Sequence, residues 1–308
     1  MEGTYKIMEL RTLSYFLAVA REGSILGAAN TLHLTQPNLS RQMKELELEV
    51  GKQLFIRSNR NITLTEDGIL LRKRADEILT LVKKTESELA KREEAVSGEV
   101  YIGSGEFDSF HYFSTAARHL TEKHPDICFH IYSGNSMEIL ERLEAGLLDF
   151  GLLIEPVDVN QYDFLYQPAA ESCGVIMRKD DPLAQKDAIC PEDLRGLPLI
   201  MPRQFMEYGF LTRWIGEMPE KLNIIATTDL PYNATIMVAD GMGYSICIDF
   251  DLFTGTSDSK LCFRPFKPGL NAGVYIVWKK YQPFSKAAQA FLEQLKEEIA
   301  LLTDSADT

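Results

Sequence analysis

The chain contains 308 residues, of which 45% are hydrophobic and 25% are charged. These values are typical of a water-soluble protein with two or three domains. No apolar stretch reaches the ~18 residues that span a bilayer, and the first ten residues lack the apolar core of a signal peptide. We therefore expect a cytoplasmic protein with no membrane partner.

The net charge of −13 is distributed unevenly. Residues 1–65 carry +2, residues 66–95 carry −1 and residues 96–308 carry −14. A polyanionic partner is therefore expected to contact only the N-terminal part. The five cysteines are widely spaced and form no CxxC pair, so reduced, packed thiols are expected.

Three short helical patterns come first in the chain. Apolar residues recur from Leu10 to Ala20 and predict a helix that ends near Gly23. Ser24 is a suitable N-cap for a second helix. Thr35 is expected to cap a third helix, with Pro37 in its first turn.

The third helix is predicted to bury Leu39, Met43 and Leu46 and to end at Gly51. The run LFIRSNRNITL that follows predicts two short strands joined by a turn. Three helices and a hairpin indicate a winged helix-turn-helix. Such a unit places the start of the helix that follows the turn, here the third helix, in the major groove of DNA.

The start of the third helix carries short polar side chains that a protein core does not need. Amides can pair with adenine, arginine with guanine, and a threonine methyl can contact thymine. Capping of a surface helix is the alternative reading of the same residues. The tandem helices and the hairpin favour contact with DNA. The candidate residues are Thr35, Gln36, Pro37, Asn38, Ser40 and Arg41.

Residues 66–95 predict a long helix, because no proline interrupts them and their only glycine, Gly68, lies in the first turn. Thr65 is its expected N-cap. Apolar positions recur with heptad spacing, which predicts a seam between two copies of the chain. Packing of this helix on its own domain is the alternative. The seam consists of Leu71, Ala75, Ile78, Val82, Thr85 and Leu89.

Strand and helix patterns alternate after residue 97, which predicts an α/β domain with largely parallel strands. Ligands in such sheets bind beyond the carboxyl ends of strands. Helix N-termini and hydroxyl or amide groups at these places would suit a carboxylate or another small anion, and Arg203 could add a charge-assisted pair. A surface salt bridge is the alternative role for Arg203.

Enzyme motifs are missing from the sequence: there is no GxSxG, HExxH, P-loop or glycine fingerprint. Four histidines between His111 and His130 do not fit one helix face, so we expect no metal site. We therefore expect no enzymatic activity and no cofactor. A cytoplasmic small-molecule-binding protein without a role in gene control is the alternative function, but it leaves residues 1–65 unexplained.

The chain resembles the LysR-type transcriptional regulators. The resemblance rests on ELRTLSYFLAVAREGSILGAANTLHLTQPNLSRQMKELELEVGKQLFIR, on LTEDG and on the long helix. It continues through LERLEAGLLDFGLLI, DDPLAQ, LRGLPLI and MVADGMGYSI. Two departures are notable: His33 stands where the motif often has glycine, and Gly27 weakens the second helix.

The resemblance implies a DNA-binding transcriptional regulator whose operator binding is modulated by a small-molecule effector. It implies a winged helix-turn-helix at 8–65, a linker and dimerisation helix at 66–95 and an effector domain at 97–308. The effector domain should resemble periplasmic binding proteins, with lobe I at about 97–167 and 272–302 and lobe II at about 168–271. Expected partners are double-stranded DNA, a second copy of the chain, tetramers of such dimers, and RNA polymerase.

The resemblance also assigns site residues. Its DNA-reading positions fall on the residues already named at the third helix, with Arg57 and Arg60 of the hairpin near phosphate or the minor groove. Its effector-pocket positions map onto Ser104, Asn135, Ser136, Pro202, Arg203 and Asn233.

Overall fold

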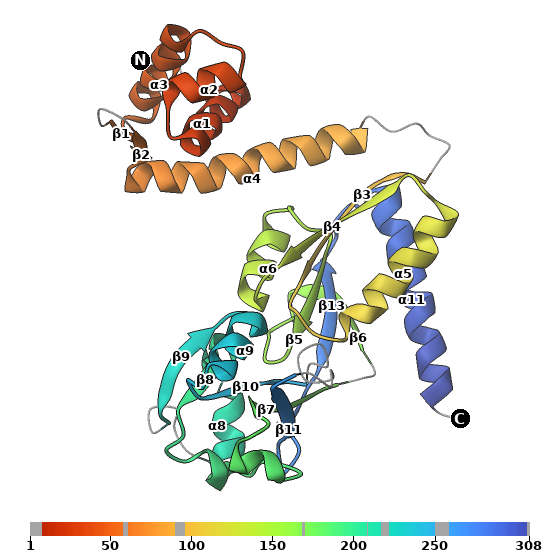
Figure 1. Cartoon of the computed structure of the whole chain (residues 1–308). Helices are drawn as coiled ribbons and strands as arrows, with labels where there is room; N and C mark the ends of the chain where they lie inside the picture. Colours follow the sequence, from red (N-terminus) through yellow and green to blue (C-terminus); the bar gives the residue numbers. More distant parts are fainter. Residues whose placement is uncertain are drawn as a thin grey trace. The chain divides into compact units, whose positions relative to one another are not determined.

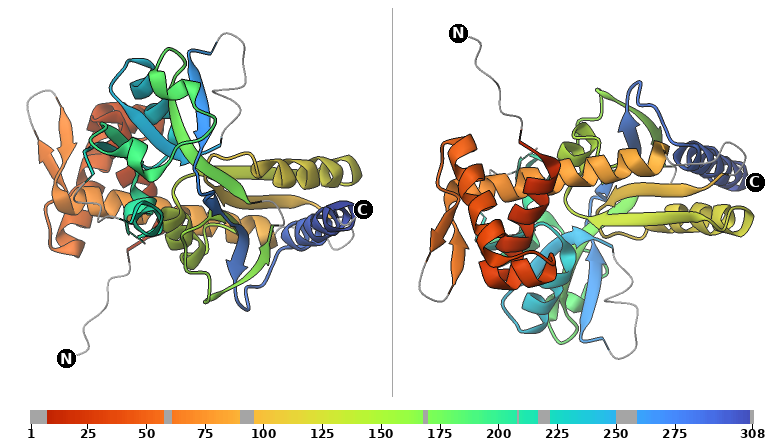
Figure 2. Two further views of the ribbon diagram at one scale, coloured as in Figure 1. Left: turned by 90° about the horizontal axis from the view of Figure 1, so that it is seen from below. Right: turned by 90° about the horizontal axis from the view of Figure 1, so that it is seen from above.

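The computed structural model describes residues 8–57, 61–89, 96–167, 170–207, 209–216, 222–249 and 259–306. The chain divides into two compact units, Met1–Ala90 and Lys91–Thr308. Figures 1 and 2 show the helices and strands of each unit.

The first unit begins with three helices whose ends agree with the expected caps. They are α1 (Leu10–Glu22), α2 (Ile25–Thr31) and α3 (Gln36–Val50). Gly23 follows α1 with φ 60°, a left-handed conformation that glycine adopts without a steric cost. The hydroxyl of Ser24 accepts a hydrogen bond from the N–H of Gly27 at 3.3 Å and so caps α2.

The expected hairpin follows α3. Its antiparallel strands are β1 (Phe55–Arg57) and β2 (Ile62–Leu64). Leu39, Met43 and Leu46 are fully buried, so the stripe predicted for α3 is confirmed. They share one core with side chains of α1, α2 and the start of β1, among them Phe16 and Phe55. This core positions α3 within the unit.

Helix α4 (Glu66–Leu89) completes the first unit. The hydroxyl of Thr65 accepts a hydrogen bond from the N–H of Gly68 at 3.0 Å, which confirms the expected cap. A Cβ atom on Gly68 would lie 2.2 Å from the carbonyl oxygen of Leu54, so only glycine permits this close approach. The first turn of α4 is therefore held against the segment that precedes the hairpin.

The N-terminal part of the heptad prediction was wrong. Ala75 is fully buried in the core of its own unit, and Leu71 and Leu79 pack against that core. The reason is that α4 contacts α1, which occupies the seam at these positions. Further along the helix, the side chains of Leu81 and Leu89 are 42% and 81% exposed.

The second unit contains two sheets. In the first, β3 is parallel to β4 and β5, and β13 is antiparallel to β5 and β6. The strand order is β4-β3-β5-β13-β6. The strands are β3 (Gly98–Ser104), β4 (Ile127–Ser133), β5 (Phe150–Ile154), β6 (Tyr162–Tyr166) and β13 (Val274–Lys279).

Three helices accompany the first sheet: α5 (Phe110–Lys123), α6 (Ser136–Glu144) and α11 (Lys286–Ala306). The figures show α5 and α11 side by side (Figures 1 and 2). Phe291 of α11 is fully buried and its ring contacts those of Phe113 and Phe150. The C-terminal segment of the chain therefore completes the core that residues 98–166 begin.

The second sheet has the order β11-β7-β10-β8-β9, and β12 also pairs with β7. Strand β8 is parallel to β9 and β10, whereas β7 is antiparallel to β10, β11 and β12. The strands are β7 (Glu171–Arg178), β8 (Leu199–Pro202), β9 (Ile224–Thr228), β10 (Tyr244–Ile248), β11 (Leu261–Pro265) and β12 (Asn271–Ala272).

Helices α7 (Arg203–Glu207), α8 (Phe210–Ile215) and α9 (Pro231–Ala239) belong with this second sheet, as do short 3-10 helices at Pro182–Gln185 and Pro191–Leu194. The chain passes from the first sheet to the second between β6 and β7 and returns between β12 and β13. We refer to the parts built on the first and second sheets as the first and second lobes.

Candidate functional sites

The turn before α3 requires an unusual backbone. His33 has φ 55°, a left-handed conformation that histidine adopts more readily than most residues. The next residues extend to Thr35, which occupies the N-cap position of α3 with φ −78° and ψ 140°. The prediction that the Thr35 side chain caps the helix was wrong, because that side chain makes no capping hydrogen bond. Its exposed hydroxyl is available to an outside partner.

The candidate reading residues share one surface at the start of α3. Gln36 and Pro37 are exposed, and Asn38 and Ser40 are half-buried. The side chain of Arg41 is 72% exposed, with its Nε 3.9 Å from Glu45 Oε1. The neighbouring Leu39 is buried, so the helix separates a core face from a polar face. The side chain of Arg57 and all of Arg60 lie outside the described residues.

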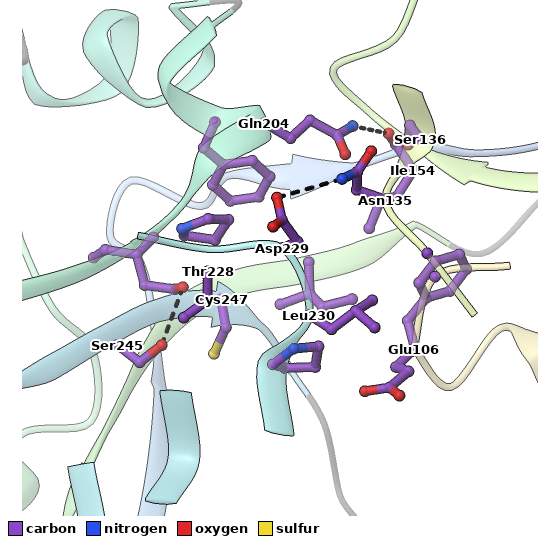
Figure 3. Close-up of a pocket in the computed structure, with 18 residues that line it drawn as sticks. Glu106, Asn135, Ser136, Ile154, Gln204, Thr228, Asp229, Leu230, Ser245 and Cys247 are labelled. Atoms are coloured by element: carbon purple, nitrogen blue, oxygen red, sulfur yellow. Dashed lines mark hydrogen bonds between the residues drawn. The ribbon is translucent and has the colours of Figure 1, made fainter. Parts of the chain in front are cut away.

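A cavity of about 90 Å³ lies between the two lobes of the second unit (Figure 3). The first lobe contributes the ends of β3 and β5 and the start of α6, and the second lobe contributes the ends of β8, β9 and β10. Most of its wall is apolar. The lining residues are Gly105, Glu106, Phe107, Gly134, Asn135, Ser136, Ile154, Pro202, Gln204, Phe205, Thr228, Asp229, Leu230, Pro231, Ser245, Ile246, Cys247 and Ile248.

Three of the six expected effector residues line this cavity: Asn135, Ser136 and Pro202. Ser104 does not, because its buried hydroxyl donates a hydrogen bond to the carbonyl oxygen of Gly105 at 2.6 Å. Arg203 lines a smaller neighbouring cavity of about 30 Å³. Asn233 lies on the exposed side of α9 and lines neither of the two.

Several lining residues lie one to four positions away from the residues that the sequence predicts. Helix α9 begins at Pro231, so the cavity receives Asp229 and Leu230 rather than Asn233. After β8, the helical turn of α7 brings Gln204 and Phe205 to the wall. The residues that directly follow each predicted strand include Asp229 after β9, whereas the side of a short helix such as α7 is not evident from its sequence.

Polar groups around the cavity differ in whether they already have partners. The side chain of Asn135 caps α6 by accepting a hydrogen bond from the N–H of Glu138 at 3.0 Å. Ser136 is only 6% exposed, and within the described part of the chain its hydroxyl has no hydrogen-bond partner. The N–H groups in the first turn of α6 carry the positive end of the helix dipole. The hydroxyl of Ser136 and these N–H groups can therefore donate hydrogen bonds to an acceptor group of a ligand.

Two side chains of the second lobe reach the first lobe beside the cavity (Figure 3). Gln204 Nε2 donates hydrogen bonds to the carbonyl oxygens of Ile154 at 2.7 Å and Pro156 at 2.9 Å. Asp229 accepts a hydrogen bond from Asn135 Nδ2 at 3.3 Å. The lobes are therefore joined by hydrogen bonds at the cavity wall and not only through the two connecting segments.

The thiol of Cys247 lines the cavity but is poorly suited to act as a nucleophile. Burial raises its pKa, and the neighbouring Cys173 and Asp249 groups raise it further, so it stays protonated at neutral pH. Burial also raises the pKa of Cys173 to about 12. Among the described residues no group of three or more His, Cys, Asp or Glu side chains could hold a metal ion.

A winged helix-turn-helix and a two-lobed α/β unit with a cavity between its lobes define a class of protein. It is a transcriptional regulator with a DNA-binding part and an effector-binding part in one chain. Comparisons with known protein families assign both parts. Residues 10–69 match the "Bacterial regulatory helix-turn-helix protein, lysR family" and residues 93–300 match the "LysR substrate binding domain". The chain therefore belongs to the LysR family of DNA-binding transcriptional regulators.

Curated relatives span the same architecture. The uncharacterized HTH-type transcriptional regulator YvbU of Bacillus subtilis (strain 168) is 25% identical over 294 residues, which cover 94% of this chain and 98% of YvbU. The HTH-type transcriptional regulator BsdA of the same organism is 30% identical over 244 residues, 78% of this chain and 83% of BsdA.

Solved structures show the same fold. The LysR family transcriptional regulator CbnR has a TM-score of 0.71 at 21% identity, covering 95% of this chain and 99% of CbnR. Full-length CbnR complexed with its target DNA has a TM-score of 0.70 at 22% identity, covering 94% of this chain and 100% of that one. Proteins of this family are regulators rather than enzymes. Within the described residues, no helix is both long and apolar enough to cross a membrane.

Proposed function

We propose that this regulator reads its operator with the start of α3 and that a small molecule in the interlobe cavity modulates the binding. The observation that carries the proposal is the division of α3 into a buried apolar stripe and an exposed polar start. The base-reading residues are Thr35, Gln36, Pro37, Asn38, Ser40 and Arg41. Arg57 and Arg60 contact phosphate or the minor groove.

We propose the division of labour that the sequence predicts. Residues 8–65 bind DNA, 66–95 link and dimerise, and 97–308 bind the effector. In the last part, lobe I comprises about 97–167 and 272–302, and lobe II about 168–271. The strand pairing supports these limits, because β13 joins the sheet of β3 to β6. Because the protein acts on promoter DNA, its place is the cytoplasm.

Two copies associate through the outer half of α4. The exposed apolar side chains there, Ile78, Leu81 and Leu89, recur at helical spacing and lie on the side of Val82. Burial of such a stripe against a second copy is favourable by roughly 25 cal/mol per Å² of apolar surface. A dimer presents two reading helices and so doubles the phosphate contacts of a weakly charged head. Tetramers and contact with RNA polymerase are further parts of the proposal.

The effector is a small organic anion. Ser136 supports this assignment, because it lines the cavity at the start of α6 and its hydroxyl has no hydrogen-bond partner among the described residues. Oxygen atoms of a carboxylate could accept hydrogen bonds there from the hydroxyl and from backbone N–H groups. The apolar remainder of the wall, including Phe107 and Phe205, would surround a hydrocarbon part of the ligand.

Effector binding changes the closure of the two lobes and thereby the spacing of the reading helices on a bent site. The hydrogen bonds that cross the cavity wall support such a link, because a ligand between the lobes competes with them or adds to them. DNase footprinting upstream of the protein's own coding region, with and without small organic acids, tests this. An unchanged footprint and an unchanged DNA bend with every acid that stabilises the protein would contradict it.

A thermal-shift screen of small organic acids identifies the effector class. We expect a carboxylate to raise the melting temperature of the wild type, and Ser136→Ala to lose most of that shift. Ser245→Ala is a matched control, because its hydroxyl already donates to the carbonyl oxygen of Ile246. If only neutral or cationic compounds stabilised the protein, the anion would be the wrong class.

A further inference from the structure

An internal carboxylate stands at the edge of the effector cavity. Asp229 directly follows β9 and lines both the main cavity and the smaller one beside it. Its Oδ1 accepts a hydrogen bond from Asn135 Nδ2 at 3.3 Å and lies 3.4 Å from Arg203 Nε. Figure 3 shows the carboxylate of Asp229 turned toward Asn135. One oxygen of the second lobe thus contacts an amide donor of the first lobe and a guanidinium of its own lobe.

The two partners of Asp229 are donors that an anionic ligand would need. Asn135 caps α6, and the next residue is Ser136 with its unpartnered hydroxyl. Arg203 is the only Lys or Arg that lines either cavity in the described part of the chain, and its side chain is 57% exposed. The other carboxylate of the main cavity wall, Glu106, adds negative charge and no donor.

The positive charge of Arg203 is therefore already compensated before any ligand enters. A ligand carboxylate bound at Ser136 would lie close to the carboxylate of Asp229, which is hydrogen-bonded to the adjacent residue Asn135. The two anions repel one another, and the repulsion is only partly screened in a cleft. Movement of Asp229 away from Asn135 removes the repulsion, frees an amide donor and breaks one hydrogen bond between the lobes.

We infer that Asp229 determines effector specificity. Its carboxylate occupies the position that the carboxylate of an anionic effector would take, and such an effector binds by displacing Asp229 from Asn135. This inference rests on the proposed anionic effector and deepens it. An anion binds only if its contacts outweigh those that Asp229 makes with Asn135. Because the contact between Asp229 and Asn135 joins the lobes, anion binding is coupled to the contact between the lobes. Anions that cannot also use Ser136 fail to displace it.

Isothermal titration calorimetry of the full chain with three isosteric probes tests the inference. The probes are benzoate, benzamide and benzamidine, which share a planar ring and differ in charge. For Asp229→Asn, which keeps the size of the side chain and removes its charge, we expect benzoate to bind about tenfold more tightly than to the wild type. Benzamide should be unchanged, and benzamidine should bind more weakly.

Two further variants separate charge from position. Asp240→Asn removes the same charge from an exposed site just after α9, and we expect wild-type affinities from it. Arg203→Gln in the Asp229→Asn background should lose most of the gained affinity, because the freed guanidinium is then missing. Thermal melts of each variant establish that it is folded. Should Asp229→Asn fail to fold, Asp229→Ser replaces it.

Three results would overturn the inference. One is unchanged or weaker binding of benzoate by the folded Asp229 variant. Another is an equal gain from Asp240→Asn. The third is that formate, acetate and benzoate all fail to bind the Asp229 variant. DNA binding by fluorescence anisotropy keeps the two proposals apart: organic acids that control DNA binding while Asp229→Asn changes nothing would refute the inference alone. A tenfold gain without any acid affecting DNA would refute the proposed function alone.

Discussion

The carboxylate of Glu171 accepts hydrogen bonds from both the backbone N–H and the hydroxyl of Ser109, the N–H bond being 3.0 Å long. Ser109 precedes α5 in the first lobe, whereas Glu171 begins β7 in the second. Burial raises the pKa of the Glu171 carboxyl, and the charges of Asp108 and Asp249 raise it further, against the lowering by Ser109. The ionised form of Glu171, which joins the lobes, is thus disfavoured by its burial.

This raised pKa gives stability a defined pH dependence. Between the ordinary glutamate pKa and the raised one, the folded protein binds more protons than the unfolded chain at this site, so its contribution to stability rises as the pH falls. We expect the melting temperature of Glu171→Gln minus that of the wild type to be more positive at about pH 8 than at about pH 5.5, because only the wild type ionises at this position. A difference that is the same at both pH values would contradict the assignment.

Gln204→Ala should loosen the lobes. It removes two hydrogen bonds from the carbonyl oxygens of Ile154 and Pro156, each worth about 0.5–1.5 kcal/mol. We expect a lower melting temperature and faster hydrogen exchange in the residues that line the cavity. Gln289→Ala is the control, because it loses only an exposed hydrogen bond to Glu293 on α11. Equal exchange rates in the two variants would argue against a role for Gln204 between the lobes.

Arg41→Ala should weaken specific DNA binding far more than folding. Its side chain is 72% exposed beside a buried stripe, so its loss leaves no cavity. A lost base contact costs about 1–3 kcal/mol of discrimination. Fluorescence anisotropy with operator DNA at fixed salt measures the affinity, and thermal melting measures stability. Arg21→Ala, at the exposed end of α1, serves as control. Wild-type affinity of Arg41→Ala would show that this arginine does not read DNA.

The dimer face predicted on α4 can be tested with charge. Leu81→Glu and Leu89→Glu place carboxylates on the exposed stripe, and burial of a carboxylate without a partner opposes association. We expect analytical ultracentrifugation to show dissociation toward monomers. Leu26→Glu is the control, since Leu26 is 55% exposed on α2. Unaltered assembly in both α4 variants would place the interface elsewhere.

The core under the reading helix should respond to lost volume. Leu39 is fully buried in α3, and Leu39→Ala should lower the free energy of unfolding of the first unit by about 2–5 kcal/mol. The control is Leu48→Ala in the same helix, where the side chain is 81% exposed and the cost should stay within about 0.5 kcal/mol. Urea unfolding measures both values, and similar costs for the two would contradict the assigned core.

Local signals made much of this protein predictable. Gly23, Ser24 and Thr65 mark helix ends because caps depend on residues within one turn, and all three act as expected. The buried stripe of α3 follows from its 3.6-residue period. The alternation of strands and helices after residue 97 determined the α/β class for the same reason, since each signal is complete within a short segment.

Tertiary structure decided which distant residues meet. Ala75 and Leu89 share one apolar pattern, but only Ala75 finds α1 beside it, and no periodicity in α4 distinguishes the two. Asp229 lies 94 residues from Asn135, and its place at the cavity wall depends on where α9 begins and on how the two sheets face each other. A sequence specifies its local elements through neighbouring residues, whereas a site between lobes arises only when both sheets have formed and packed.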